Sequence, residues 1–538
     1  MMSLSAMVRT ELEVLRSLAA DGSRFARWLA GAPPAALLEG PPAPPFALVG
    51  RQRWPVLGIY YRLKAIITDP TGMVVDYQRA YGDLFTVRIP FNFDLTYILS
   101  RDGYRFVMDL PPDDGPMGPV MANVPTVGFW YGRERTDTAS LQALLLAGRA
   151  FTRDVLLTPA RLSGLSERVA RRAEAHLETW GETVDLSRAL VDLLFDVSAR
   201  GVLGDDLWDR LGPQVSALYR DIVNGIDIVH TTLAVTPLRY FLPEYRSTRR
   251  LRPILDAVVA EHRRNSLGPV MDAMASIEVE GAPLSDADLS WMLMYIIWNA
   301  VIYPGTYGFW AAVDTLSTPA FLDAVRDAGP DRRRRLLTHG LLETLRLNPV
   351  ASLVRAPPRP IRYEHEGRLF TIPPRGYFGV FPYHLCHDAG TYSEPERFDP
   401  FRYQRGEPIP PVFGRGAFGC VAQRFVKTVL VGVEEAILKR FDVEILDTVP
   451  SRISRVHLTY PSKPLRARLR PAAVGAGDER GLERDEAVAA LFDGVQDAPP
   501  AAGPAAPVGT VATCPVTGKT YRRERCPVTG EERWSAAP

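Results

Sequence analysis

The sequence predicts a mainly α-helical protein with small β-sheets, and three observations support this fold class. Helical patterns cover most of residues 164–264. The stretch from Leu289 to Val313 contains no charged residue and suits a long helix that is buried on all sides. Strand-rich sequence is confined to short stretches, chiefly 82–100 and 361–382. With 538 residues and 46% hydrophobic content, the chain is long and apolar enough to bury a large core.

Charge and cysteine content exclude several classes of protein. The 63 basic and 62 acidic residues leave no basic excess, so no nucleic-acid partner is expected. Residues 1–31 mix charged and apolar positions and match neither a signal peptide nor a transmembrane anchor. Arginine outnumbers lysine, and alanine and proline are abundant, which points to a bacterial source. The chain has four cysteines, which are Cys386, Cys420, Cys514 and Cys526. Four are too few for a disulfide framework in so long a chain, so a reducing cytoplasm is the expected location.

The chain divides into three parts. Residues 1–45 are expected to form an N-terminal helix and a proline-rich lead-in. Residues 46–472 form the main domain, with early strands at 82–89 and 96–100. Residues 473–538 are rich in alanine, proline and glycine and are expected to be disordered, apart from a short helical candidate at 484–495.

The most informative feature is a cysteine in a glycine-rich loop. The stretch Phe413-Gly-Arg-Gly-Ala-Phe-Gly-Cys420 comes directly before a predicted helix at 423–433. The loop glycines permit positive φ, and the N–H groups at the helix N-terminus are expected to lower the thiol pKa. The rings of Phe413 and Phe418 can shield the sulfur from water. An anionic sulfur in such a semi-apolar nest suits a haem iron.

This stretch resembles the haem-binding signature of the cytochrome P450 superfamily, F-x-x-G-x-x-x-C-x-G, with Ala422 in place of the last glycine. The resemblance runs from about residue 51 to 470. It implies a cytochrome P450-like fold and a haem b whose iron is ligated by Cys420. It also implies that Phe413, Gly414 and Phe418 surround the cofactor.

A second pair of motifs follows the order that this family requires. Glu343 and Arg346 have the i, i+3 spacing that places two side chains on one helix face. The later segment 394–403 is similar to the family's meander motif. The resemblance implies that Glu343, Arg346 and Arg402 form a buried charge triad. Arg397 is the other candidate for the third member, but the spacing to the motif's phenylalanine and proline favours Arg402.

The carboxylates of haem propionates require cationic partners, and the sequence assigns only one such partner. The resemblance implies that Arg355 pairs with a propionate. Many family members supply further partners from the helix before Phe151, but Ser140 and Leu144 stand at those places. Arg133, Arg135 and Arg149 are close in sequence, but none matches the pattern, so the propionate partners on this side of the haem stay unassigned.

The central helix departs from the family pattern. Most members carry an acid and an alcohol that supply protons during oxygen activation, whereas no carboxylate lies between Asp288 and Asp314 here. Pro304 is expected to kink the helix. The run 298–310 resembles the subgroup of sterol and bile-acid hydroxylases and prostacyclin synthase. The candidates for a substitute proton source are Tyr303, Thr306, an ordered water on Asn299, and a polar group of the substrate.

Three functions are compatible with these observations. The first is a monooxygenase that acts on a hydrophobic lipid-like or natural-product substrate and receives electrons from an external ferredoxin and ferredoxin reductase. The second is an isomerase, dehydratase or peroxygenase that uses a peroxide substrate and needs no electrons. The third is a non-catalytic haem-binding or recruiting protein. The tail repeats Cys-Pro-Val-Thr-Gly at 514–518 and 526–530, which is a candidate docking tag for a partner.

Overall fold

The computed structural model describes most of the chain between residues 70 and 472 and three strands near the C-terminus. The described ranges are 70–88, 94–117, 130, 138–224, 233, 237–349, 353–372, 377–416, 419–450, 452–454, 459–461, 463–472, 511–513, 520–525 and 532–536. The predictions for 1–45, Phe418, the helical candidate at 484–495 and the two repeated motifs lie outside these ranges.

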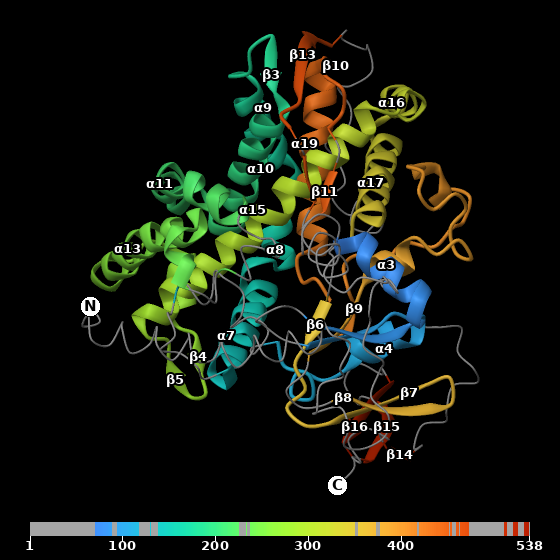
Figure 1. Ribbon diagram of the computed structural model, residues 1–538. Coiled ribbons are helices and arrows are strands. Elements are labelled where there is room, and N and C mark those ends of the chain that lie inside the picture. The colour runs from blue at the N-terminus through green and yellow to red at the C-terminus, as the bar shows by residue number, and fades with distance from the viewer. Residues whose placement is uncertain are drawn as a thin grey trace.

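The described region is mainly helical with small sheets, which confirms the predicted fold class (Figure 1). The α-helices are α3 (Pro70–Tyr81), α4 (Arg101–Asp109), α7 (Thr138–Phe151), α8 (Pro159–Leu162), α9 (Leu165–Leu177), α10 (Leu186–Leu203), α11 (Asp205–Asn224), α13 (Pro243–Arg264), α14 (Pro269–Ala275), α15 (Asp286–Leu316), α16 (Pro319–Arg326), α17 (Pro330–Leu347), α18 (Pro382–Cys386) and α19 (Gln423–Arg440). Shorter helical turns are η3 (Thr152–Leu156), η4 (Pro237–Phe241) and η5 (Pro400–Tyr403).

The strands form separate small sheets. They are β1 (Leu84–Arg88), β2 (Asp94–Ile98), β3 (Thr183–Asp185), β4 (Glu278–Val279), β5 (Ala282–Pro283), β6 (Leu353–Arg355), β7 (Ile361–His365), β8 (Arg368–Ile372), β9 (Tyr377–Val380), β10 (Phe441–Ile445), β11 (Arg452–Ser454), β12 (Thr459–Pro461), β13 (Arg466–Pro471), β14 (Val511–Thr513), β15 (Thr520–Arg525) and β16 (Glu532–Ala536). The largest sheet has the order β1-β2-β9-β6, with β2 parallel to β9. This sheet positions β6, which lines the cavity described below.

Helix α15 is the centre of the helical part (Figure 1). It begins after Ser285, whose hydroxyl accepts from the Asp288 N–H, and it packs against α10, α13, α17 and α19. Its uncharged stretch is almost entirely buried, as the sequence predicts. Pro304 lies within the helix, which continues on both sides of it. None of the described helices combines the length and the hydropathy needed to cross a bilayer.

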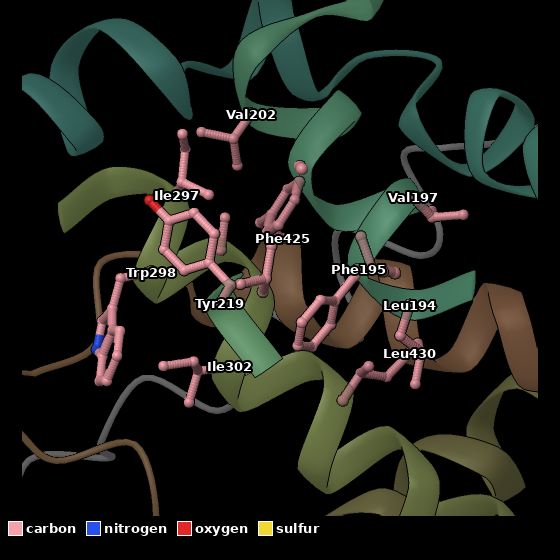
Figure 2. Close-up of a cluster of buried hydrophobic side chains, with 14 of the residues drawn as sticks. Leu194, Phe195, Val197, Val202, Tyr219, Ile297, Trp298, Ile302, Phe425 and Leu430 are labelled. Atoms are coloured by element: carbon pink, nitrogen blue, oxygen red, sulfur yellow. The ribbon is translucent and has the colours of Figure 1, made fainter. Parts of the chain in front are cut away.

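Two glycines let α10 approach α15 closely. A Cβ atom at Gly305 would lie 2.5 Å from the Phe195 ring, and one at Gly308 would lie 2.6 Å from the Leu194 side chain. Figure 2 shows these two α10 side chains beside Leu430 of α19 within one apolar cluster. Because larger residues would push the helices apart, the spacing of α10, α15 and α19 depends on these small positions.

Three short strands lie in the C-terminal region. Strands β14, β15 and β16 form an antiparallel sheet in which Val511 pairs with Arg522 and Arg523 pairs with Trp534. The expectation of disorder for residues 473–538 as a whole stays a prediction. The short runs that form these strands contain β-formers such as valine, threonine, tyrosine and tryptophan.

Candidate active site

A cavity of about 350 Å³ lies between α7, α15, α19 and strand β6. Its walls are mainly apolar, which suits a hydrophobic ligand. Its polar side chains are Gln142, Arg149, Thr152, Tyr295, Asn299, Tyr303, Tyr307, Arg355 and Cys420. None of the described residues that line it is an aspartate or glutamate.

The loop before α19 presents the Cys420 thiol to this cavity. The Cys420 N–H donates to the Phe413 carbonyl over 2.7 Å, which folds the loop back on itself. Gly414 and Gly416 have φ values of +68° and +61°, as expected for loop glycines, but Gly419 does not adopt positive φ. A Cβ atom at Gly416 would lie 2.7 Å from the Met108 carbonyl oxygen, so only glycine fits there. Phe413 and Gly414 both line the cavity beside the sulfur.

The electrostatics of Cys420 differ in part from the prediction. Burial raises the thiol pKa, and this effect outweighs a hydrogen bond from the Ala422 backbone and the positive charges of Arg149 and Lys427, all of which lower it. The backbone donor of Ala422 at the start of α19 thus lowers the thiol pKa as predicted, but the opposing effect of burial is larger and raises the pKa overall. Cys420 is exposed to the cavity but enclosed by the protein around it, and this enclosure favours the neutral thiol.

Two guanidinium groups line the same cavity. Arg355 is buried on β6, where it donates to the Gly115 carbonyl over 2.9 Å and to the Val107 carbonyl over 3.2 Å. Burial lowers its pKa to about 9, and the positive charge of Arg149 adds to this effect. Arg149 on α7 donates to the Gly419 carbonyl, next to the cysteine. The sequence reasoning left Arg149 unassigned because it does not occupy the family's usual position.

One face of α15 forms another part of the cavity wall. Tyr295, Asn299, Tyr303 and Tyr307 all line the cavity, consistent with their i, i+4 spacing. The Asn299 amide donates to the Tyr295 carbonyl over 2.8 Å, and the rings of Tyr303 and Tyr307 stack at 6.5 Å. Burial raises the pKa of the Tyr303 phenol, which therefore keeps its proton at neutral pH.

Thr306, one of the predicted site residues, does not lie on this cavity wall. Thr306 is buried but is not among the residues that line the cavity. Tyr295 lines it and was missed, although it lies one helical turn before Asn299 on the same face. The repeat of polar residues at positions 295, 299, 303 and 307 was the signal that could have identified it.

The three residues of the predicted charge triad, Glu343, Arg346 and Arg402, are in contact with one another. Glu343 and Arg346 of α17 are completely buried and form two hydrogen bonds of 2.8 Å. Arg402 of η5 is also completely buried and donates to Glu343 over 2.9 Å. The Tyr403 hydroxyl donates to the same carboxylate over 2.9 Å. Arg397 instead forms an exposed pair with Glu394, as the motif spacing indicates.

Hydrogen bonds satisfy the buried charges of this triad. Burial lowers the pKa of Arg346, but the hydrogen bonds and the negative charge of Glu343 outweigh this effect and raise it. The Arg346 guanidinium also donates to the Cys386 carbonyl over 2.7 Å, and that of Arg402 donates to Glu407 over 2.6 Å. Such a network fixes the geometry of α17 relative to the segment after α18 more than it adds net stability.

The residues that line the cavity fit a haem. Among the described residues that line the cavity, Cys420 is the one thiol, and the single negative charge of its thiolate suits an iron that a porphyrin already holds in place. Two guanidiniums on the same walls can bind the carboxylates of a porphyrin. The apolar residues between them, including Leu145, Ala300 and Val354, suit a flat aromatic ring.

The comparisons with known proteins agree with this geometry. The family model for cytochrome P450 matches residues 332–468, which include the triad and the cysteine loop. Sterol 14-demethylase of Arabidopsis thaliana is 23% identical over 329 residues, which are 54% of this chain and 65% of that protein. Obtusifoliol 14-alpha demethylase of Sorghum bicolor is 22% identical over 434 residues, 74% of this chain and 85% of that protein.

A solved structure supports the fold. Retinoic acid-bound cyanobacterial CYP120A1 superposes with a TM-score of 0.62 at 16% sequence identity, and the match covers 80% of this chain and 100% of that one. The family model, the relatives and the shared fold agree: residues 332–468 match the cytochrome P450 family, whose members are haem-thiolate oxidoreductases with a cysteine that holds the haem iron, and the described chain has the fold of a solved P450 structure.

Proposed function

We propose that this protein is a monooxygenase that holds haem b through Cys420 and oxidises a hydrophobic substrate. The observation that carries the proposal is the placement of the Cys420 thiol and two guanidiniums around one largely apolar cavity. Bound haem supplies the oxygen activation and the oxidising power of such an enzyme. Relatives named as sterol demethylases support a lipid-like substrate, and a natural product is the other class that the apolar walls can accept.

The residues of the chain have separate tasks in this proposal. Cys420 would hold the haem iron through its sulfur, and Arg149 and Arg355, which line the same cavity, would bind the carboxylates of the cofactor. The apolar walls exclude water and bind the substrate. Tyr303 holds a proton on its phenol oxygen, and the Asn299 amide can position a water or a polar group of the substrate. The Glu343–Arg346–Arg402 network braces the segments beneath the loop.

Electrons are expected from a ferredoxin and a ferredoxin reductase, in the cytoplasm. The low cysteine content supports that location. The direct test is turnover of the purified full chain with NAD(P)H, ferredoxin and its reductase against a panel of sterols, fatty acids and polyketides. Oxygenated product that requires every component supports the proposal. Equal product formation in the absence of the electron donors contradicts it.

A peroxide-driven reaction is the second candidate, and the missing carboxylate favours it. No acidic side chain is found among the described residues of the cavity wall, so the usual acid that assists oxygen activation is missing from them. A lipid peroxide already contains the O–O bond, and isomerisation, dehydration or peroxygenation then needs no external electrons. Catalytic consumption of a fatty-acid hydroperoxide or cumene hydroperoxide without reductant would support this candidate, whereas bleaching of the haem alone would contradict it.

A further inference from the structure

A row of phenols faces the cavity from α15. Tyr295, Tyr303 and Tyr307 all line it, and the rings of Tyr303 and Tyr307 are nearly parallel, at an angle of 8° and with 6.5 Å between their centroids. Every residue from 289 to 313 is buried except Tyr295, Asn299 and Tyr303, which are partly exposed. Because all three line the cavity, this exposure is toward the cavity.

The cavity wall offers these phenols no base. None of the described residues that line it is an aspartate, a glutamate or a histidine. Loss of a proton alone from Tyr303 or Tyr307 therefore finds no carboxylate or imidazole to accept it. Loss of an electron alone would leave a positive charge on a buried ring, which is costly without a partner. The electron and the proton are thus expected to leave together, as a hydrogen atom, which a phenol gives up more readily than the aliphatic side chains around it.

An organic hydroperoxide is an acceptor that takes up both the electron and the proton. Its reduction to an alcohol and water breaks the O–O bond and consumes two electrons and two protons. Tyr303 and Tyr307 can supply one electron and one proton each, and both then become phenoxyl radicals. Bound haem would provide the site at which the O–O bond breaks. The residues that fit this haem, Cys420 and Arg355 among them, line the same cavity as the two phenols.

We propose that Tyr303 and Tyr307 are hydrogen-atom donors that give this protein a further activity, the reduction of organic hydroperoxides to alcohols. This inference goes beyond the proposed oxidation of a hydrophobic substrate but rests on the same haem site. The activity operates when no oxidisable substrate fills the cavity. A one-electron reductant such as ascorbate then returns an electron and a proton to each phenoxyl radical, which restores both phenols and completes the cycle.

The test adds one molar equivalent of cumene hydroperoxide to haem-loaded, substrate-free, full-length protein, which is then freeze-quenched for electron paramagnetic resonance spectroscopy. The wild type should show an organic radical signal that narrows when the protein contains ring-deuterated tyrosine. The double variant Tyr303→Phe/Tyr307→Phe should lose this signal. Tyr219→Phe is the matched control and should retain it, because Tyr219 is a completely buried phenol that donates to the Met294 carbonyl of α15 over 3.0 Å but does not line the cavity. Figure 2 shows the Tyr219 ring within the apolar cluster.

A second readout is the formation of cumyl alcohol with ascorbate present. The wild type and Tyr219→Phe should form it catalytically, whereas the double variant should lose this activity and bleach its haem instead. If the double variant does not retain haem, the single variants Tyr303→Phe and Tyr307→Phe replace it, and each should lower the radical yield.

A tyrosyl signal and an alcohol yield that survive loss of both phenols would overturn the inference. The absence of a tyrosyl radical from wild-type protein that shows a thiolate-ligated haem in its reduced carbon monoxide complex would overturn it as well, while leaving the haem site intact. Failure of the proposed function is distinct, because the wild type itself would then lack the thiolate spectrum.

Discussion

The guanidinium of Arg402 donates to Glu343 over 2.9 Å, and both side chains are completely buried although the residues are far apart in sequence. Glu343→Gln should therefore lower the free energy of unfolding by about 3–5 kcal/mol, because it removes the anion that two buried arginines share and leaves Arg346 without its paired carboxylate. Urea denaturation of the haem-loaded protein measures this change. Glu394→Gln is the control, since Glu394 pairs with Arg397 at the surface and such pairs contribute about 0–1 kcal/mol. Equal stabilities of the two variants would contradict the assigned role of the triad.

Arg355 gives a prediction about cofactor retention. Arg355→Met should increase the rate of haem loss about tenfold or more, since a charge-assisted hydrogen bond contributes about 1.5–3 kcal/mol. Transfer of haem to an excess of apomyoglobin measures the rate. Arg359→Met serves as the control, because Arg359 is more than half-exposed and pairs with Asp114 at the surface. The assignment fails if the two variants lose haem at the same rate while both remain folded.

The wall of α15 gives a prediction about turnover. Tyr303→Phe should slow turnover at least about tenfold, because it removes the hydroxyl that the structure places at the cavity. Thr306→Ala should stay within about twofold of the wild type, since Thr306 does not line the cavity. Steady-state rates with saturating substrate and electron donors provide the comparison. A large loss in Thr306→Ala with none in Tyr303→Phe would reverse the assignment.

Glu434 gives a prediction about pH. Burial and the nearby charge of Asp314 raise its pKa from the ordinary 4.5 to about 7, although a hydrogen bond with Thr315 opposes them. The folded protein then holds this proton more tightly than the unfolded chain does. Its contribution to stability is complete below about pH 4.5 and is lost as the pH rises through 7, for a total of about 3 kcal/mol.

Glu434→Gln should remove this part of the pH dependence. The variant should match the wild type near pH 4 and exceed its free energy of unfolding at pH 8, because glutamine carries no charge at either pH. Urea denaturation at both pH values measures the difference. Glu444→Gln is the control, because this carboxylate of β10 is half-exposed. A wild-type pH profile in Glu434→Gln would show that Glu434 does not titrate in this range.

The sequence predicts those parts of the site that local spacing determines. The cysteine loop, the i, i+3 pair on α17 and the choice of Arg402 over Arg397 all follow from fixed offsets between neighbouring residues. Which face of α15 meets the cavity depends on its packing against α10 and α19, and local spacing alone does not show that Tyr295 lines the cavity and Thr306 does not. Arg149 of α7 is far from the loop in sequence, so only the folded chain brings its guanidinium to the Gly419 carbonyl beside Cys420.

The central claim is that Cys420 ligates the haem iron, and the optical spectrum of the reduced, carbon monoxide-bound protein tests it most directly. The comparison uses the wild type, Cys420→Ser and Cys386→Ala. Cys386 is the control because its thiol is completely buried, and burial raises its pKa to about 12. The wild type and Cys386→Ala should show the red-shifted Soret band of a thiolate-ligated haem, and Cys420→Ser should lose it. A wild-type band that persists in Cys420→Ser, or that is missing from well-folded wild-type protein loaded with haem, would contradict the claim.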